Sequence, residues 1–517
     1  MVRIKRRTFI AGMLHAAAAT ASKGQVPLLL KGAMPSSTLA TDPRRPQYHL
    51  LPAANWMNDP NGPIYFNGHY HMFYQYNPNG AFWGDMHWGH AISPDMIHWQ
   101  HLPVVLAPTP GGPDSEGCFS GTAVVQNGKV VFLYTGVRTA PQDQATIKDG
   151  VNSLRETQCL AIADDSSLTK FTKLAEPVIA APPAGMKVTG FRDPSPWRQG
   201  DAWYMVVGSG IPHQGGAVLL YRSKDLRIWD FVCIAAGGTG NGIDTDNPVD
   251  SGDMWECPDL FALGDKHVLI YSTKGKALWQ TGVLDEKEMK FHPERTGTLD
   301  RGTLYAPKTQ LDNSGNRILW GWVPETRPLE EYKASGWAGL MSLPRVLSLA
   351  GDGELKVEVA AGVKQLRKSE QTFAAMPNEE HNQRQIAALR IYQCCGEILC
   401  LVRNSAAPVE LSLCNSTETG TPWLTVKYDP QESGKVWVDS NSLSVPRGEK
   451  ENLEIHLYID GSVIELFLNE RVAYTQRFYY SGDRAPDVCL KWVGRTTDIE
   501  KLTVWQLTPI STNRLTS

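Results

Sequence analysis

Short runs of apolar and aromatic residues, broken by Gly, Pro, Asn and Asp, follow one another from about residue 48 to 345. Four of them lie at 70–74, 130–134, 203–207 and 267–271. Each run is rich in β-branched or aromatic residues and is bounded by turn residues, which is typical of β-strands. No long segment has the periodicity of an amphipathic helix. The pattern therefore predicts an all-β fold.

A weak internal repeat divides this region. The string Ser-Pro-Asp-Met-Ile-His-Trp at 93–99 resembles Ser-Lys-Asp-Leu-Arg-Ile-Trp at 223–229, and looser copies lie at 167–171 and 288–291. The closing aromatic residues fall at 99, 171, 229 and 291, so the gaps are 72, 58 and 62 residues. About 60 residues hold four strands and their loops, which is the content of one propeller blade. The spacing predicts a five-bladed β-propeller over residues 45–345.

The pattern changes after about residue 350. Two segments of alternating apolar and polar residues, 453–459 and 463–468, flank the turn Asp460-Gly461. This is typical of a β-hairpin with one buried face. We therefore predict a linker and a β-sandwich over residues 346–517.

The N-terminus has the features of an export signal. Basic residues at positions 3, 5, 6 and 7 precede a mildly apolar run that ends in Ala19-Thr20-Ala21. The string Arg6-Arg7-Thr8-Phe9-Ile10 resembles a twin-arginine signal, and the small residues resemble its cleavage site. We predict an export signal and a flexible lead over residues 1–44, and hence a periplasmic or extracellular protein. The run is too short to span a bilayer, and we predict no membrane span.

Composition excludes several functions. The 517 residues are 42% apolar and 20% charged, as in ordinary globular proteins, and the formal charge of −4 gives no electrostatic drive toward nucleic acid. The nine cysteines show no zinc-ligand spacing, and an odd number cannot all pair internally. We predict no metal ion, no cofactor and mostly buried free thiols. Nothing in the sequence indicates the oligomeric state.

Three acidic residues lie in unusual contexts: Asp59 in Trp-Met-Asn-Asp-Pro-Asn-Gly at 56–62, Asp193 in Arg-Asp-Pro, and Glu256 in Trp-Glu-Cys-Pro. Asp-Pro followed by Asn-Gly predicts a turn at 56–62. Each acid is followed by Pro within two positions, which fixes the local backbone. Apolar neighbours lower the local polarity, as raising the pKa of one acid requires. Because a propeller gathers strand ends around its centre, the three acids are candidates for a shared site there. Most Asp-Pro pairs only form turns, and this alternative stays open for Asp193 and Glu256 on their local sequence alone.

In this order, these strings resemble those of glycoside hydrolase family 32, which includes invertases, fructan exohydrolases, inulinases and levanases. The similarity also includes Phe119-Ser120-Gly121 and the segment 459–467, and it extends from about residue 45 to 510. The resemblance implies a five-bladed propeller with an appended β-sandwich, which agrees with the domains predicted above.

The family also implies roles for individual residues. Asp59 corresponds to the nucleophile, Glu256 to the acid/base, and Asp193 to the carboxylate that stabilises the transition state. Retaining glycosidases need one ionised carboxylate and one protonated acid on either side of the scissile bond. The residues expected to bind substrate are Asn58, Gln75, Trp83, Phe119, Ser120, Arg192 and Trp337.

The resemblance therefore implies a retaining hydrolase that releases fructose from the non-reducing end of sucrose, inulin or levan. A fructosyltransferase of the same family, in which a sugar hydroxyl replaces water, is the main alternative. A catalytically inactive sugar-binding propeller is disfavoured, because all three acids are present.

Overall fold

The computed structural model describes residues 36–517 except 149–152, 241–246, 405–406, 417–420, 433–434, 447–450, 512–513 and 516–517. The predicted export signal lies outside the described residues. The α-helices of the described chain are short: α2 (Ser36–Thr41), α3 (Pro248–Ser251), α4 (Leu329–Ser335) and α5 (Glu379–Ala388). In the described part of the chain, no helix is long and apolar enough to cross a membrane. Strands make up most of the rest, so the all-β prediction is confirmed.

Five sheets fill the N-terminal part of the chain. The first contains β20 (Trp337–Ala338), β1 (Asn55–Phe66), β2 (His69–Asn77), β3 (His87–Ser93) and β4 (Gln100–Leu106). The second contains β5 (Gly117–Gln126), β6 (Lys129–Thr139), β8 (Ser153–Ala163) and β7 (Ile147–Lys148), with β9 (Phe171–Lys173) paired to β8. The third contains β10 (Phe191–Gln199), β11 (Ala202–Ile211), β12 (Gly215–Ser223) and β13 (Asp230–Gly237). The fourth contains β14 (Glu256–Leu263), β15 (Lys266–Thr273), β16 (Lys276–Asp285) and β17 (Lys290–Thr298). The fifth contains β18 (Tyr305–Leu311), β19 (Arg317–Val323), β22 (Arg345–Leu349) and β23 (Leu355–Val359), with β21 (Leu340–Met341) paired to β19.

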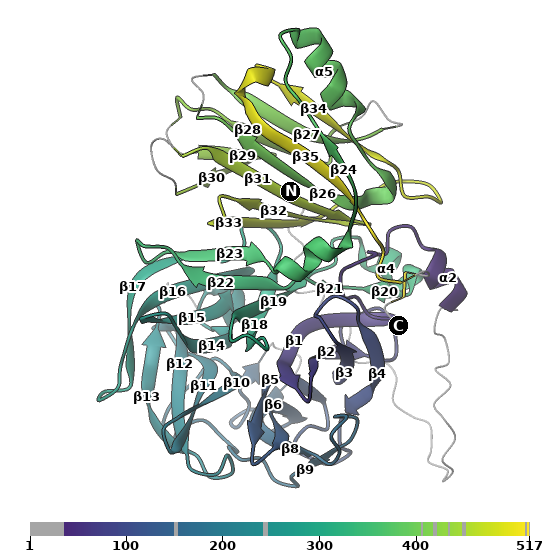
Figure 1. The fold of residues 1–517 in the computed structure, drawn as a ribbon. Coiled ribbons are helices and arrows are strands. Elements are labelled where there is room, and N and C mark those ends of the chain that lie inside the picture. The colour runs from purple at the N-terminus through teal and green to yellow at the C-terminus, as the bar shows by residue number, and fades with distance from the viewer. Residues whose placement is uncertain are drawn as a thin grey trace.

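The first strands of the five sheets contact one another in a closed ring. Strand β1 contacts β5 and β18, β10 contacts β5 and β14, and β14 contacts β18. Figure 1 shows the five sheets around this ring, with the other strands farther out. Residues far apart in the sequence are therefore brought together wherever they lie on first strands.

The sequence repeat marks the same place in four sheets. Its closing aromatic residues lie just before or within the last strands β4, β9, β13 and β17, and they pack into the apolar layers between sheets. In two of these turns the Asp holds the backbone identically: Asp95 accepts N–H bonds from Ile97 and His98, and Asp225 accepts them from Arg227 and Ile228. The repeat is therefore structural.

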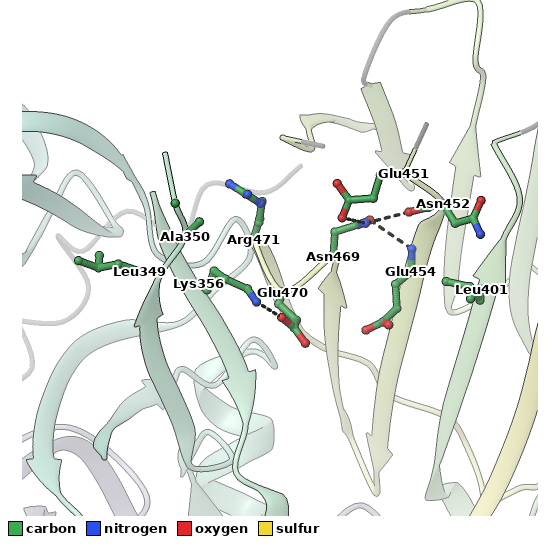
Figure 2. A pocket seen from close by; sticks show the side chains of 11 residues that line it. Leu349, Ala350, Lys356, Leu401, Glu451, Asn452, Glu454, Asn469, Glu470 and Arg471 are labelled. Carbon is green, nitrogen blue, oxygen red and sulfur yellow. Dashed lines mark hydrogen bonds and ion pairs between the residues drawn. The ribbon is translucent and has the colours of Figure 1, made fainter. Parts of the chain in front are cut away.

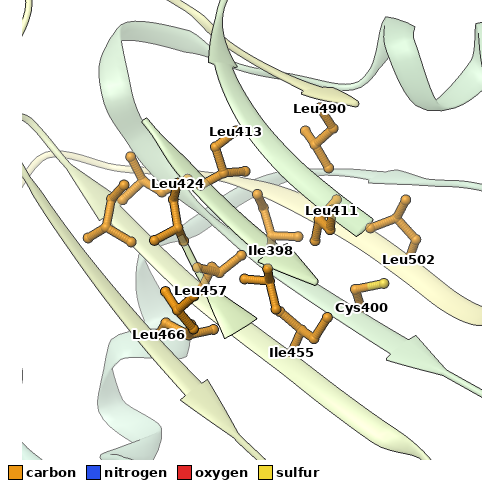
Figure 3. Close-up of a cluster of buried hydrophobic side chains, with 14 of the residues drawn as sticks. Ile398, Cys400, Leu411, Leu413, Leu424, Ile455, Leu457, Leu466, Leu490 and Leu502 are labelled. Carbon is orange, nitrogen blue, oxygen red and sulfur yellow. The ribbon is translucent and has the colours of Figure 1, made fainter. Parts of the chain in front are cut away.

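Two further sheets form a β-sandwich. One has the order β24 (Arg367–Thr372), β35 (Ile499–Leu507), β26 (Cys395–Val402), β31 (Leu453–Asp460), β32 (Val463–Leu468) and β33 (Val472–Arg477). The other has the order β25 (Arg390–Ile391), β34 (Val488–Val493), β27 (Val409–Asn415), β28 (Leu424–Tyr428), β29 (Lys435–Val438) and β30 (Asn441–Ser444). Figure 3 shows the apolar core that both sheets bury, with Ile398 and Leu457 from one sheet and Leu411 and Leu413 from the other. The predicted hairpin is β31–β32.

The predicted boundary at residue 345 is wrong. Strands β22 and β23 pair with each other and with β19, so they belong to the fifth N-terminal sheet. The chain leaves this sheet only after Val359. The alternation of apolar residues does not distinguish the last strands of one domain from the first strands of the next.

A fully buried ionic network joins the N-terminal sheets to the sandwich. Arg345 of β22 binds Asp300 Oδ2 at 2.9 Å and Glu465 Oε2 of β32 at 2.7 Å. His49 lies between Asp460 Oδ2 at 2.8 Å and Glu465 Oε1 at 3.1 Å. Burial alone lowers the pKa of His49, but hydrogen bonds to the two carboxylates raise it from 6.5 to about 9. The stability that this histidine contributes is therefore present below pH 6.5 and is lost as the pH rises through 9.

Replacing Arg345 with Met is expected to lower the free energy of unfolding by about 3–5 kcal/mol, because Asp300 and Glu465 would stay buried without their cation. Denaturant unfolding of the two proteins measures this difference. The matched control is Arg384→Met on α5, whose ion pair with Glu380 is exposed, with side-chain exposures of 77% and 75%. We expect that control to change stability by less than about 0.5 kcal/mol. Equal effects of the two substitutions would contradict the role of the network.

All nine cysteines are free thiols, seven of them buried and two partly exposed, as the sequence predicts.

Candidate active site

The segment 56–62 is not the predicted turn. It lies inside β1, where the pairing with β2 shifts register between Met57 and Pro60 and again between Asn61 and Ile64. These bulges accommodate the Asp-Pro and Asn-Gly pairs without ending the strand. Pairing on both edges, with β2 and β20, therefore overrides the local turn preference. Trp56 and Met57 are buried and anchor the strand.

Each first strand has a bulge near its beginning. The other four register shifts lie between Cys118 and Gly121, Arg192 and Ser195, Glu256 and Asp259, and Tyr305 and Lys308. At three of them a residue other than glycine has a positive φ, 66° at Asp193, 51° at Cys257 and 48° at Ala306. Such backbone is costly for these residue types and is common at functional sites. The bulges direct side chains of the first strands toward one another.

The three predicted catalytic acids come together around Cys257. The Sγ of Cys257 lies 3.7 Å from Asp59 Oδ2 and 3.5 Å from Asp193 Oδ2, and its backbone N–H donates to Asp193 Oδ2 at 2.8 Å. Glu256 precedes Cys257 directly in β14. Strands β1, β10 and β14 thus bring these acids into one cluster.

Polar side chains hold Asp59 in place. The hydroxyl of Ser120 donates to Asp59 Oδ2 at 2.7 Å, and the Nδ2 of Asn58 donates to Oδ1 at 3.0 Å. Gln75 joins these two partners, because it donates to Ser120 and accepts from Asn58. Burial raises the pKa of Asp59, the two hydrogen bonds lower it, and nearby Glu256 raises it, with a net upward shift. Asn58, Gln75 and Ser120 therefore lie where they were predicted, around the candidate nucleophile.

Glu256 has charged and polar partners. The Nε and Nη2 atoms of Arg192 donate to Glu256 Oε1 at 3.2 and 2.9 Å, and the Tyr305 hydroxyl donates to Oε2 at 2.6 Å. The prediction that apolar sequence neighbours surround this carboxylate is wrong, because the bulge at β14 directs it toward these groups. Arg192 lies in the site as predicted, whereas Tyr305, from β18, was missed. The only sequence signal for Tyr305 is Tyr-Ala-Pro, which places Pro two positions after it, as at Glu256.

Two aromatic residues lie beside the acid cluster. The rings of Trp83 and Phe119 meet edge to face, with centroids 5.8 Å apart, and both remain partly exposed. They pack against the buried group that contains Trp56, Cys257 and Tyr305. An exposed aromatic pair at this place is suited to contact a sugar ring.

Trp337 does not form part of this wall. It is fully buried, its Nε1 donates to Asp42 Oδ2 at 2.8 Å, and the guanidinium groups of Arg45 and Arg327 lie 5.2 and 5.0 Å from its ring centre. The indole has no accessible surface or free donor for a sugar. The prediction that Trp337 contacts substrate is therefore wrong.

Comparison with known proteins agrees with this geometry. The model of the glycosyl hydrolases family 32 N-terminal domain matches residues 49–358, and the model of the family 32 C-terminal domain matches residues 362–506. The chain belongs to glycoside hydrolase family 32. The junction between the two matched regions also agrees with the end of β23 at Val359.

Relatives of this family 32 chain cover between about three fifths and nine tenths of its length. It is 34% identical to a sucrose-6-phosphate hydrolase of Escherichia coli, over 89% of this chain and 94% of that protein. It is 37% identical to a raffinose invertase of Escherichia coli, over 62% of this chain and 66% of that protein. A solved β-fructofuranosidase of family 32 from Bombyx mori is 31% identical, covers 92% of this chain and 96% of its own, and has a TM-score of 0.72. The chain is a glycoside hydrolase of the β-fructofuranosidase type, with the family's β-propeller and β-sandwich.

The surroundings of Asp193 in the family 32 site disfavour the charged form of its carboxyl group. Burial raises the pKa of Asp193, Arg192 lowers it, and Glu256 and Asp59 raise it further, so that it shifts from 3.8 to about 7. Between these values the folded protein binds a proton more tightly than the unfolded chain does. This carboxyl therefore reduces stability progressively as the pH rises from 3.8 to about 7.

Replacing Asp193 with Asn is expected to raise the Tm by a few degrees at about pH 8 and by less at about pH 5, while activity is lost. The amide oxygen still accepts the N–H of Cys257, and the variant removes only the buried charge. Thermal unfolding of wild type and variant at both pH values measures the effect. A variant that is less stable than wild type at the higher pH would contradict it.

A separate cavity of about 590 Å³ lies where the fifth sheet meets the sandwich. Figure 2 shows its charged lining, including the ion pair of Lys356 with Glu470. None of the predicted site residues lines it. It is therefore distinct from the acid cluster.

Proposed function

We propose that the protein is a retaining hydrolase that releases fructose from the non-reducing end of β-fructosides through a covalent fructosyl-enzyme. The observation that carries the proposal is the contact of Cys257 with both Asp59 and Asp193, beside Glu256. Three carboxyl groups around one point match the needs of a reaction with a cationic transition state.

In the first step, an oxygen of Asp59 attacks the anomeric carbon of the fructosyl unit. The glycosidic C–O bond breaks, and Glu256 gives its proton to the leaving oxygen. Asp193 stabilises the positive charge that develops on the sugar. The Tyr305 hydroxyl and the Arg192 guanidinium then donate to the Glu256 carboxylate, which stabilises the charge it has just acquired.

In the second step, Glu256 takes a proton from water, and the water oxygen attacks the anomeric carbon. The bond to Asp59 breaks and the free carboxylate returns. Because the anomeric carbon is inverted twice, fructose leaves with its original configuration. Ser120 and Asn58 stabilise the Asp59 carboxylate before attack and after release.

The five N-terminal sheets correspond, in this proposal, to the five blades of the propeller. The closed ring of β1, β5, β10, β14 and β18 supports it, since each first strand contacts two others. The five bulges around the ring supply Asp59, Ser120, Asp193, Glu256 and Tyr305.

Sucrose and sucrose 6-phosphate are the substrates that the comparisons support most. One solved relative is a Bombyx mori β-fructofuranosidase variant in complex with sucrose, and several similar proteins are sucrose-6-phosphate hydrolases. The test is chromatographic measurement of sugars released from sucrose, sucrose 6-phosphate, inulin and levan by the purified protein. We expect equal amounts of fructose and glucose from sucrose. Glucose in excess of free fructose would show transfer to sugar acceptors, and no release from any substrate would contradict the proposal.

A further inference from the structure

Behind Arg192 lies a second carboxylate that does not belong to the acid cluster. Glu156 of β8 is fully buried, and its Oε1 binds Arg192 Nη1 at 2.8 Å. Its Oε2 accepts the backbone N–H of Phe191 at 2.7 Å. One carboxylate therefore fixes both the side chain of Arg192 and the backbone that begins β10. Nothing in the sequence around Glu156 distinguishes it from the other acids of the chain.

The guanidinium of Arg192 is shared between two glutamates. Its Nη1 atom faces Glu156, while Nε and Nη2 face Glu256. The two partners differ in access to solvent, since the side chain of Glu156 is 0% exposed and that of Glu256 is 17% exposed. A cation in contact with Glu256 favours its ionised form, which opposes its use as a proton donor. A buried anion on the other side of the same cation weakens this effect.

We infer that Glu156 is a positioning residue of the reaction. It orients Arg192 toward Glu256 and offsets part of the positive charge of Arg192, so that Glu256 can hold the proton that it gives to the leaving group. The inference rests on the proposed role of Glu256 as the acid. Once that proton has left, Arg192 is already placed to bind the new carboxylate, so one arrangement serves both protonation states.

Other charged and titratable groups also face Glu256, and all of them stay unchanged when Glu156 is replaced. Asp59 on β1 and Asp193 on β10 add negative charge, Tyr305 on β18 donates a hydrogen bond, and Cys257 is the neighbour in β14. The buried cation Lys308 on β18 lies behind them and donates to the carbonyl oxygen of Pro258. Replacing Glu156 with Gln therefore removes one negative charge beside Arg192 and leaves the other charged groups around Glu256 in place.

The test is the pH profile of kcat/KM for sucrose in Glu156→Gln. Its alkaline limb reports loss of the proton from the catalytic acid of the free enzyme. Without the charge of Glu156, Arg192 stabilises the Glu256 carboxylate more strongly, so we expect this limb to move by about one pH unit toward acid. A role in folding alone would lower kcat/KM at every pH and leave the limb in place, which would overturn the inference.

Two further variants make the test specific. Glu156→Asp keeps the charge, so its limb is expected to stay at the wild-type pH although kcat falls; a limb that moves as in Glu156→Gln would overturn the electrostatic part. If Glu156→Gln does not fold, the profile of Glu156→Asp against wild type still tests the electrostatic part, because a limb that moves toward acid although the charge is kept would overturn it. Glu397→Gln is the control, since Glu397 is equally buried and paired with Arg367 in the sandwich, and it is expected to leave the profile unchanged. Failure of wild type to release any sugar would instead refute the proposed function.

Discussion

Replacing Asp59 with Asn is expected to lower kcat for sucrose by roughly 10⁴-fold or more, because an amide oxygen cannot form the fructosyl ester. The substitution is nearly isosteric. Ser120 can still donate to the remaining oxygen, so the local structure and the affinity for substrate should change little. Initial rates of fructose release, with substrate affinity measured by calorimetry, test both parts.

The matched control is Asp225→Asn. This exposed carboxylate holds the repeated turn between β12 and β13 by accepting the backbone N–H groups of Arg227 and Ile228, and it contacts none of the three acids. We expect its activity to remain within about twofold of wild type, as is usual for surface substitutions. If Asp59→Asn kept a tenth of the activity or more, Asp59 would not be the nucleophile.

The second large effect is expected for Glu256→Gln, which should lower kcat for sucrose by roughly 10²–10⁴-fold, the usual contribution of a general acid and base. The loss should depend on the leaving group. Fluoride departs without a proton, so β-fructosyl fluoride should form the covalent intermediate at nearly the normal rate. Azide needs no general base, so its addition should speed turnover of the variant and yield fructosyl azide.

Kinetics with the two substrates, with and without azide, separate this role from simple loss of structure. Wild type serves as the control, because azide should leave its rate unchanged when the base is present. Equal losses on sucrose and on the fluoride, with no effect of azide, would contradict the assignment of Glu256.

Features that depend on local patterns were predictable from the sequence. The strands follow from alternating and β-branched residues, and the hairpin β31–β32 follows from Asp460-Gly461 between two such segments. The repeat also located equivalent turns, because Asp95 and Asp225 bind the same backbone positions in different sheets. The acids were found because their Pro-containing contexts and the family resemblance point to the same residues.

Features that depend on pairing between distant segments were not predictable. The segment 56–62 has strong turn chemistry, yet its pairing with β2 and β20 keeps it in a strand. The partners of Glu256, which are Arg192 and Tyr305, lie 64 and 49 positions away in the sequence. Trp337 was assigned to the substrate pocket from the family resemblance, but the cations that cover it, Arg45 and Arg327, come from other parts of the chain. Composition and periodicity contain no information on such contacts.

The covalent fructosyl-enzyme on Asp59 is tested most directly by peptide mass spectrometry of Glu256→Gln after incubation with β-fructosyl fluoride. In this variant the ester forms readily but lacks the base that activates water, so it should accumulate. We expect the proteolytic peptide that contains Asp59 to carry one added hexosyl unit, which disappears when azide is added before quenching. Consumption of the fluoride with this peptide unmodified, or with the hexosyl unit on another carboxylate, would contradict a covalent intermediate on Asp59.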